Sequence, residues 1–137
     1  MILRDRHGNV KDVRHIKNII TNSGLSEIIK LIGGLGGSPF RYIAIGSGTT
    51  SPSASDTALE AEIARAEATV SQETTSVSGD TLRLEASFSF TANYSITESG
   101  VFNASSGGVM LARQTFPALN VVSGDVLTVI WKIQASR

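Results

Sequence analysis

The sequence contains no cysteine among its 137 residues. Disulfide bonds, thiolate metal ligands and thiol nucleophiles are therefore excluded. His7 and His15 are the only histidines, and no carboxylate stands at a recognised ligand spacing from them, so we expect no metal site. No apolar run is long enough for a bilayer, and no apolar core of a signal peptide follows the early charges.

The chain has no net charge and few aromatic side chains. The 12 Lys and Arg residues balance the 12 Asp and Glu residues, and aromatic residues make up 6% of the chain. A general nucleic-acid binder needs a basic field that displaces counterions, which a chain of zero net charge does not supply. We therefore expect no nucleic-acid partner, no membrane partner and no cofactor.

Catalytic motifs are missing as well. No Gly-x-Ser-x-Gly sequence surrounds a serine, and "GSG" (46–48) lacks the spacing and the lysine of a phosphate-binding loop. Glu98 is the best remaining carboxylate, but it has no partner near it in sequence, and catalysis needs a positioned partner or a tuned pKa. We predict that Glu98 bonds backbone amides or an arginine, and that the protein is not an enzyme.

The first 20 residues are interpreted as an arm, separate from a domain over 21–137. "HGN" (7–9) looks like a turn between two short extended pieces. The arm is either a frayed terminus or a segment that packs on a neighbouring subunit. Its candidate interaction residues are Arg4, Arg6, His7, Lys11, Arg14, His15 and Lys17.

Two short helices are predicted. The first covers 23–32, with Thr21, Asn22 or Ser23 as the cap and Gly33-Gly34 as the stop. Its apolar face is expected to cover a sheet and consists of Leu25, Ile28, Ile29 and Ile32. The second covers 57–65, with a cap at Ser55 or Asp56 and an apolar pair at Leu59 and Ile63.

The remaining pattern indicates β-strands. Residues 40–48 are apolar on both faces, whereas 82–91 alternate strictly between apolar and polar side chains. "VSGD" occurs at 77–80 and 122–125, and each copy precedes an alternating strand. These features predict an antiparallel β-sandwich or partial barrel. Phe88, Phe90 and Trp131 are expected in its core and Tyr94 on its surface.

Two segments resemble proteins of tailed phages. "ITESGVFNASSGGVMLARQTF" (96–116) and "VVSGDVLTVIWKI" (121–133) resemble the strand–turn–strand of phage tail-collar fibre N-terminal domains, through Ile96, Glu98, Gly100 and Phe102. Val101 stands where those domains more usually have leucine. "YIAIGSGTTSPSASDTALEAEIAR" (42–65) resembles the glycine-rich stretch and helix of small tailed-phage structural proteins.

The resemblance implies a structural virion protein, assembled in the host cytoplasm. It would be a fibre-type or adaptor module that docks on a symmetric tail or collar assembly, with copies of itself as partners, as a homotrimer, and with other virion proteins. One alternative is a capsid decoration (cement) protein on the head. Another is a carbohydrate-binding module for adsorption. A glycosidase needs two facing carboxylates, and the sequence offers no such pair.

Overall fold

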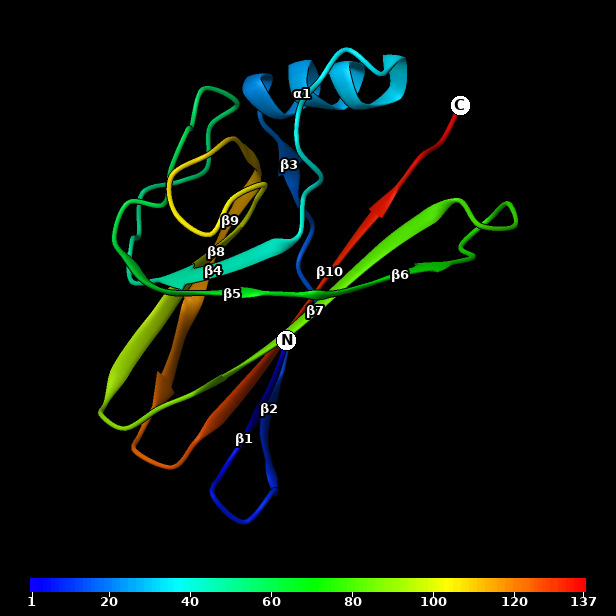
Figure 1. Cartoon of the computed structure of the whole chain (residues 1–137). Helices are drawn as coiled ribbons and strands as arrows, with labels where there is room; N and C mark the ends of the chain where they lie inside the picture. Colours follow the sequence, from blue (N-terminus) through cyan, green and yellow to red (C-terminus); the bar gives the residue numbers. More distant parts are fainter.

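The computed structural model describes all 137 residues, which form two antiparallel sheets and one helix (Figure 1). Sheet A has the order β2-β1-β10-β7-β6 and sheet B the order β3-β9-β8-β4-β5. The elements are β1 (Ile2–Arg4), β2 (Val10–Val13), β3 (Ile19–Ile20), α1 (Asn22–Gly33), β4 (Tyr42–Gly46), β5 (Glu62–Glu67), β6 (Thr69–Glu73), β7 (Thr81–Ser89), β8 (Tyr94–Phe102), β9 (Met110–Val121) and β10 (Val126–Gln134). The prediction of a mainly β, antiparallel fold is confirmed.

The main core lies between the inner faces of the two sheets. In sheet A the strict alternation of β7 and β10 puts one set of side chains inside, and the register pairs Phe88 with Leu127 and Leu84 with Trp131. Sheet B supplies Ile43 and other buried aliphatic side chains. The prediction that Phe88, Phe90 and Trp131 belong to the core is confirmed, and Tyr94 is exposed as expected.

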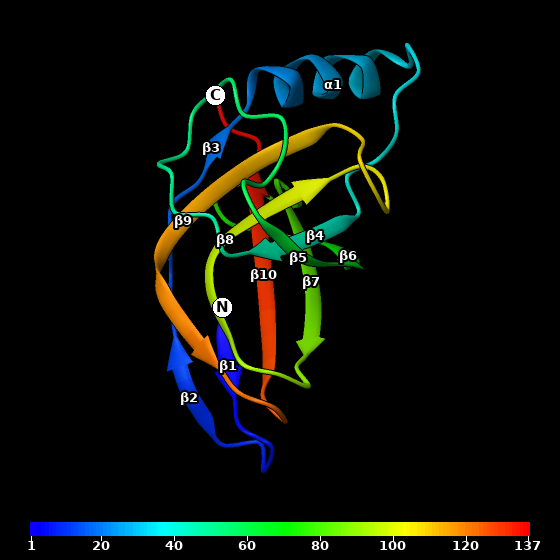
Figure 2. The same ribbon diagram turned by 90° about the vertical axis from the view of Figure 1, so that its left-hand side faces the viewer.

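The two sheets are connected at one side by a continuous segment. β5 at the edge of sheet B continues into β6 at the edge of sheet A through the buried Ala68, whose backbone N–H donates to Arg41 O at 2.7 Å. The long strand β9 runs through sheet B from the α1 end of the molecule towards the β1–β2 end (Figure 2). Both layers therefore extend along the full length of the core.

The predicted first helix is confirmed, but the prediction of its packing face is wrong. Thr21 caps α1, and Gly34, at a φ of 65°, ends it. Ile28 packs against the core, whereas Leu25, Ile29 and Ile32 are exposed to solvent. Periodicity identifies residues that share a face, but the side that meets the sheet is set here by a close backbone approach, described below.

The predicted helix over 57–65 is wrong. Residues 62–67 form β5, which pairs with β4, and the preceding residues form an irregular loop. Leu59 and Ile63 lie in separate apolar clusters, so they do not form a helical i, i+4 pair. Ala and Glu favour a helix, but intrinsic propensity is a small effect, and pairing with the distant strand β4 overrides it.

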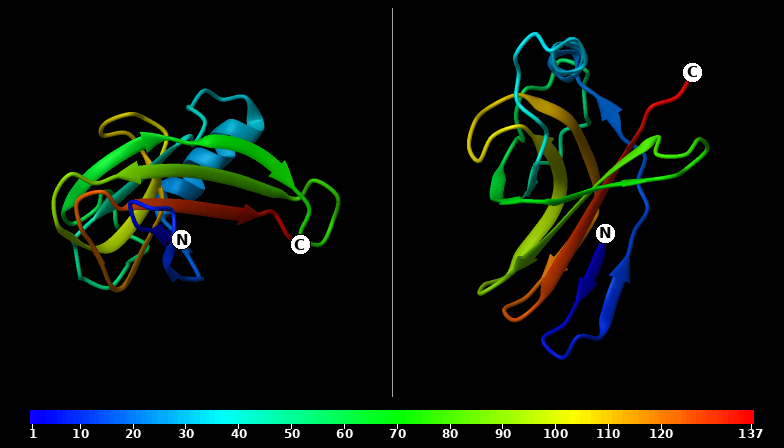
Figure 3. Two further views of the ribbon diagram at one scale, coloured as in Figure 1. Left: turned by 90° about the horizontal axis from the view of Figure 1, so that it is seen from below. Right: turned by 45° about the vertical axis from the view of Figure 1, so that its right-hand side comes forward.

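The segment interpreted as an arm belongs to both sheets: β1 and β2 form a hairpin of sheet A, and β3 pairs with β9 in sheet B. β1 pairs with β10, Leu3 is buried in the main core, and 5–9 make the predicted turn. The hairpin lies at the opposite end of the molecule from α1 (Figure 3). Residues 2–4 are therefore part of the domain, and contact with a neighbouring subunit stays a prediction for the exposed edge strand β2.

Both Val-Ser-Gly-Asp segments are turns, as predicted. Gly79 and Gly124 have φ values of 74° and 95°, which glycine adopts without steric cost. Hydrogen bonds from backbone N–H groups, that of Val77 foremost, lower the pKa of Asp80. Lys11 Nζ donates to Asp125 at 2.7 Å and lowers the pKa of that carboxyl group. Each aspartate thus stabilises its turn as a charged acceptor.

Candidate functional site

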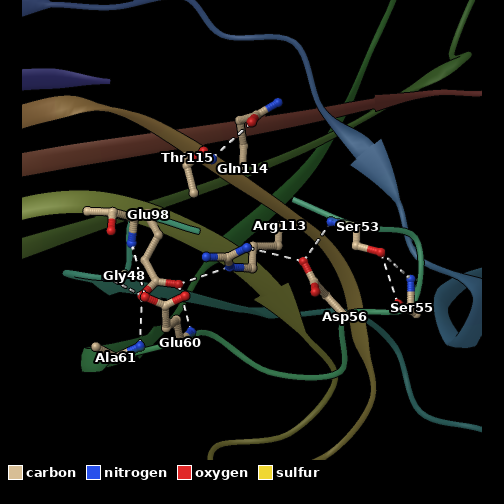
Figure 4. Close-up of polar contacts among 11 residues, drawn as sticks. Gly48, Ser53, Ser55, Asp56, Glu60, Ala61, Glu98, Arg113, Gln114 and Thr115 are labelled. Carbon is tan, nitrogen blue, oxygen red and sulfur yellow. Dashed lines mark hydrogen bonds and ion pairs between the residues drawn. The ribbon is translucent and has the colours of Figure 1, made fainter. Parts of the chain in front are cut away.

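Glu98 lies on the outer face of sheet B, beneath the loop 47–61. Its neighbour Ser99 points into the core, where its hydroxyl accepts from Trp131 Nε1, so alternation turns Glu98 outwards. The loop covers Glu98 completely, and its exposed fraction is 0% (Figure 4). A buried carboxylate of this kind is costly unless hydrogen bonds and charges compensate it.

Four donors surround the Glu98 carboxylate. Gly48 N and Ala61 N donate to Oε2 at 2.6 and 2.8 Å. Glu60 N and Arg113 Nε donate to Oε1 at 2.9 and 3.0 Å. A carboxylate has about four lone-pair sites, two on each oxygen. Every site is therefore engaged, and both predicted partner types, backbone amides and an arginine, are confirmed.

Arg113 extends the network to the loop. It lies on β9 opposite Gly100 of β8 and is 3% exposed. Its Nη1 donates to Asp56 Oδ2 at 3.1 Å, while its buried Nη2 has no partner (Figure 4). Asp56, a predicted cap of the second helix, instead accepts from Arg113 and from Ser53 N in the loop. The sequence carries no signal for this pairing, because the two residues are 57 positions apart.

The glycines of "GSG" make room for this carboxylate. A Cβ on Gly46 would lie 2.8 Å from Glu98 Oε2, and a Cβ on Gly48 would lie 2.7 Å from Glu98 Cδ. Both distances are shorter than real Cβ contacts. The Gly-x-Gly pattern is thus explained by a carboxylate from the same chain, which occupies the space that a phosphate would need.

Gly48→Ala is expected to destabilise the protein by about 1–3 kcal/mol, because overpacking forces neighbours to move. The added Cβ would lie 2.5 Å from Glu60 Cβ as well as against Glu98. Urea unfolding measures the loss. Gly33→Ala is the matched control, since its Cβ would meet Leu35 Cγ at an ordinary 3.4 Å. Equal stability of Gly48→Ala and the wild type would contradict the inference that Gly48 makes room for the Glu98 carboxylate.

Gly100 and Phe102 of β8 also hold the loop. Leu59 packs with Ala44, Phe102 and Met110 in a small second core on the outer face of sheet B. A Cβ on Gly100 would lie 3.0 Å from Leu59 Cδ2, so glycine admits this side chain. Ile96, the first motif residue, lies in the main core instead. Glu98, Gly100 and Phe102 therefore act together as a clamp on 47–61.

The candidate residues of the arm do not gather into one patch. His7 and His15 are exposed, as is Lys17. The other cations have partners within the chain: Arg4 donates to Gly8 O, Arg6 to Ser123 O, Lys11 to Asp125, and Arg14 to Asp12 and to the carbonyls of Pro117 and Ala118. These bonds hold the hairpin and its connection against β9 and the β9–β10 turn.

A cavity of about 360 Å³ lies between residues 13–18 and the sandwich. Its lining includes Ile16, Ser99, Gln114, Phe116 and Trp131. Ser99 and Trp131 bond each other, and Gln114 donates to Lys17 O, so these polar groups are already paired. The sequence does not reveal this cavity, because its walls come from segments far apart in the chain.

No group of three or more His, Cys, Asp or Glu residues is arranged to hold a metal ion. The one helix is too short to cross a bilayer. No protein-family model, curated protein or solved structure matches the chain. At the site itself, a saturated carboxylate and an arginine paired through Nε and Nη1 fix the loop, and the unpaired Nη2 of Arg113 is buried.

Proposed function

We propose that this protein is a non-enzymatic structural protein of a tailed-phage virion. It acts as a fibre-type or adaptor module that docks on a symmetric tail or collar assembly as a homotrimer. It is assembled in the host cytoplasm and needs no cofactor, nucleic acid or membrane. Its partners are copies of itself and other virion proteins.

The observation that supports this proposal is the structural role of the residues that resemble those of phage fibre domains. Glu98, Gly100 and Phe102, which carry the resemblance, are engaged in clamping the loop 47–61 onto sheet B. A module whose most buried polar groups fix its shape suits an assembly role, in which the surface must stay constant while partners bind. For Glu98 to act as a general acid or base, it would instead need a free lone pair within hydrogen-bond reach of a substrate.

Two alternatives stand beside this role. A capsid decoration protein would use the same rigid sandwich on the head of the virion. A carbohydrate-binding module would need exposed aromatic side chains, and here Trp131 and the phenylalanines Phe88 and Phe90 are buried while Tyr94 is exposed. The burial of these aromatic side chains therefore favours a role in assembly over one in sugar binding.

The test is to purify virions produced in cells that express the chain together with its neighbouring genes. Mass spectrometry should find the chain in the particles, and cryo-electron microscopy should place it on the tail or collar. Density on the head would support the decoration role instead. Absence of the chain from purified particles would contradict both, and binding on a glycan array would favour the carbohydrate module.

A further inference from the structure

Helix α1 exposes apolar side chains in addition to Ile28 and Leu31, which it packs on the main core. Its buried residues are Gly24 and Glu27, while Leu25, Ile29 and Ile32 are 54%, 62% and 78% exposed. Leu35, just past the end of the helix, is 72% exposed. A surface helix normally turns its apolar side chains to the core and its polar ones to water. We call Leu25, Ile29, Ile32 and Leu35 the α1 stripe.

Specific contacts fix this orientation. A Cβ on Gly24 would lie 2.7 Å from Leu111 O, so glycine lets the helix approach β9 closely. Glu27 accepts from Ser38 N at 3.1 Å, and Lys30 Nζ lies 3.9 Å from its carboxylate. The two charged residues of the helix therefore face each other. The helix cannot turn its aliphatic face inwards without breaking these contacts.

The α1 stripe has the spacing and size of an interface. Its helical members stand at i, i+4 and i+7, the alternation found along the seam of paired helices. Four aliphatic side chains exposed to this degree form a patch on the order of 400 Å², a size at which exposed apolar patches are often functional. Two such patches face to face would bury on the order of 800 Å², which suits a weak contact that other surfaces reinforce.

We propose that the α1 stripe is a contact between copies of this chain, with α1 of one copy packed against α1 of another. When the same patch of each copy packs around a symmetry axis, any charge in that patch comes close to its own copies, so such a self-contact is favourable only where the patch is uncharged. The stripe carries no charge, and the only cation of α1, Lys30, is directed to Glu27.

A membrane surface fits the stripe less well. A helix that lies on a membrane carries Lys and Arg along its polar face and often aromatic residues on the apolar face. Helix α1 has a single lysine, which is engaged, and no aromatic residue. This inference rests on the proposed function only for the expected number of copies in the assembly, which is three.

Sedimentation analysis of the purified chain tests the contact. We expect the wild type to associate towards a trimer as its concentration rises, and the double variant Ile29→Glu/Ile32→Glu to lose most of this association with an unchanged far-UV spectrum. Val77→Glu is the matched control, since Val77 is 54% exposed but lies in the β6–β7 turn. A monomeric wild type, or equal dissociation of the control, would overturn the contact.

Cross-linking gives a second readout, because the chain has no cysteine of its own. Ile29→Cys and Ile32→Cys each introduce one thiol, and at least one of them should form an interchain disulfide on mild oxidation, which Val77→Cys should not. Failure of both would exclude the α1 contact. A chain absent from virions but joined through α1 would refute the proposed function and leave this inference intact.

Discussion

Glu98→Ala is expected to lower the free energy of unfolding by about 3–5 kcal/mol, the usual cost of breaking a buried ion pair by removing one partner. The variant leaves Gly48 N, Glu60 N and Ala61 N without their acceptor and Arg113 without its main counterion. The loop 47–61 then loses its backbone hydrogen bonds to Glu98 and keeps the hydrogen bonds that join Asp56 to Arg113 and Gly48 O to Thr97. Urea unfolding followed by tryptophan fluorescence measures the change.

Glu60→Ala is the control for this variant. Glu60 is an exposed carboxylate of the same loop whose pKa is lowered by hydrogen bonds from Thr50 and from Thr49 N, and because solvent screens it, its removal should cost much less than that of Glu98. A structural clamp predicts a large difference between the two variants. A Glu98→Ala protein as stable as the wild type would return Glu98 to the list of candidate catalytic groups.

The strands could be predicted because their pattern is local. In β7 the alternation of apolar and polar side chains is complete over nine residues, and burial follows it: Leu84, Ala86 and Phe88 are inside and Ser87 and Ser89 are outside. Turn chemistry is equally local, since Gly79 and Gly124 supply a backbone conformation that few other residues adopt. These signals need no knowledge of distant partners.

The predictions from sequence fail where contacts between residues far apart in the chain determine the structure. Residues 57–65 have helical propensity, but β4 pairs with 62–67, and Asp56 bonds Arg113 across the sheet. The amphipathic pattern of α1 is real, yet with Gly24 close to Leu111 only part of the apolar side packs on the core, and Leu25, Ile29 and Ile32 are exposed. Propensity and periodicity describe one segment at a time and cannot supply this information.

The candidate site could be predicted only in part. Glu98 was correctly expected to bond amides or an arginine, because a lone buried carboxylate needs such partners. Which groups they are could not be predicted, since Gly48 and Ala61 stand 50 and 37 positions away. Gly46 and Gly48 stand out in the sequence, but the reason for glycine at these positions is the side chain of Glu98, which comes from the distant strand β8.

Phe88→Ala is expected to cost about 3–5 kcal/mol, because it removes a buried aromatic side chain and leaves a cavity that the rigid sheets do not fill. Phe88 is 6% exposed and pairs with Leu127 in the centre of sheet A. Phe88→Leu should cost less, since the leucine side chain fills part of the space. Thermal and urea unfolding measure both variants.

Tyr94→Ala is the aromatic control for Phe88. Tyr94 is 41% exposed, and its ring centroid lies 6.0 Å from that of Phe90, so its removal should cost about 1 kcal/mol through this edge contact. The order Phe88→Ala, then Phe88→Leu, then Tyr94→Ala distinguishes a core aromatic from a surface platform. If Phe88→Ala folds with undiminished stability, Phe88 does not belong to the core between the sheets.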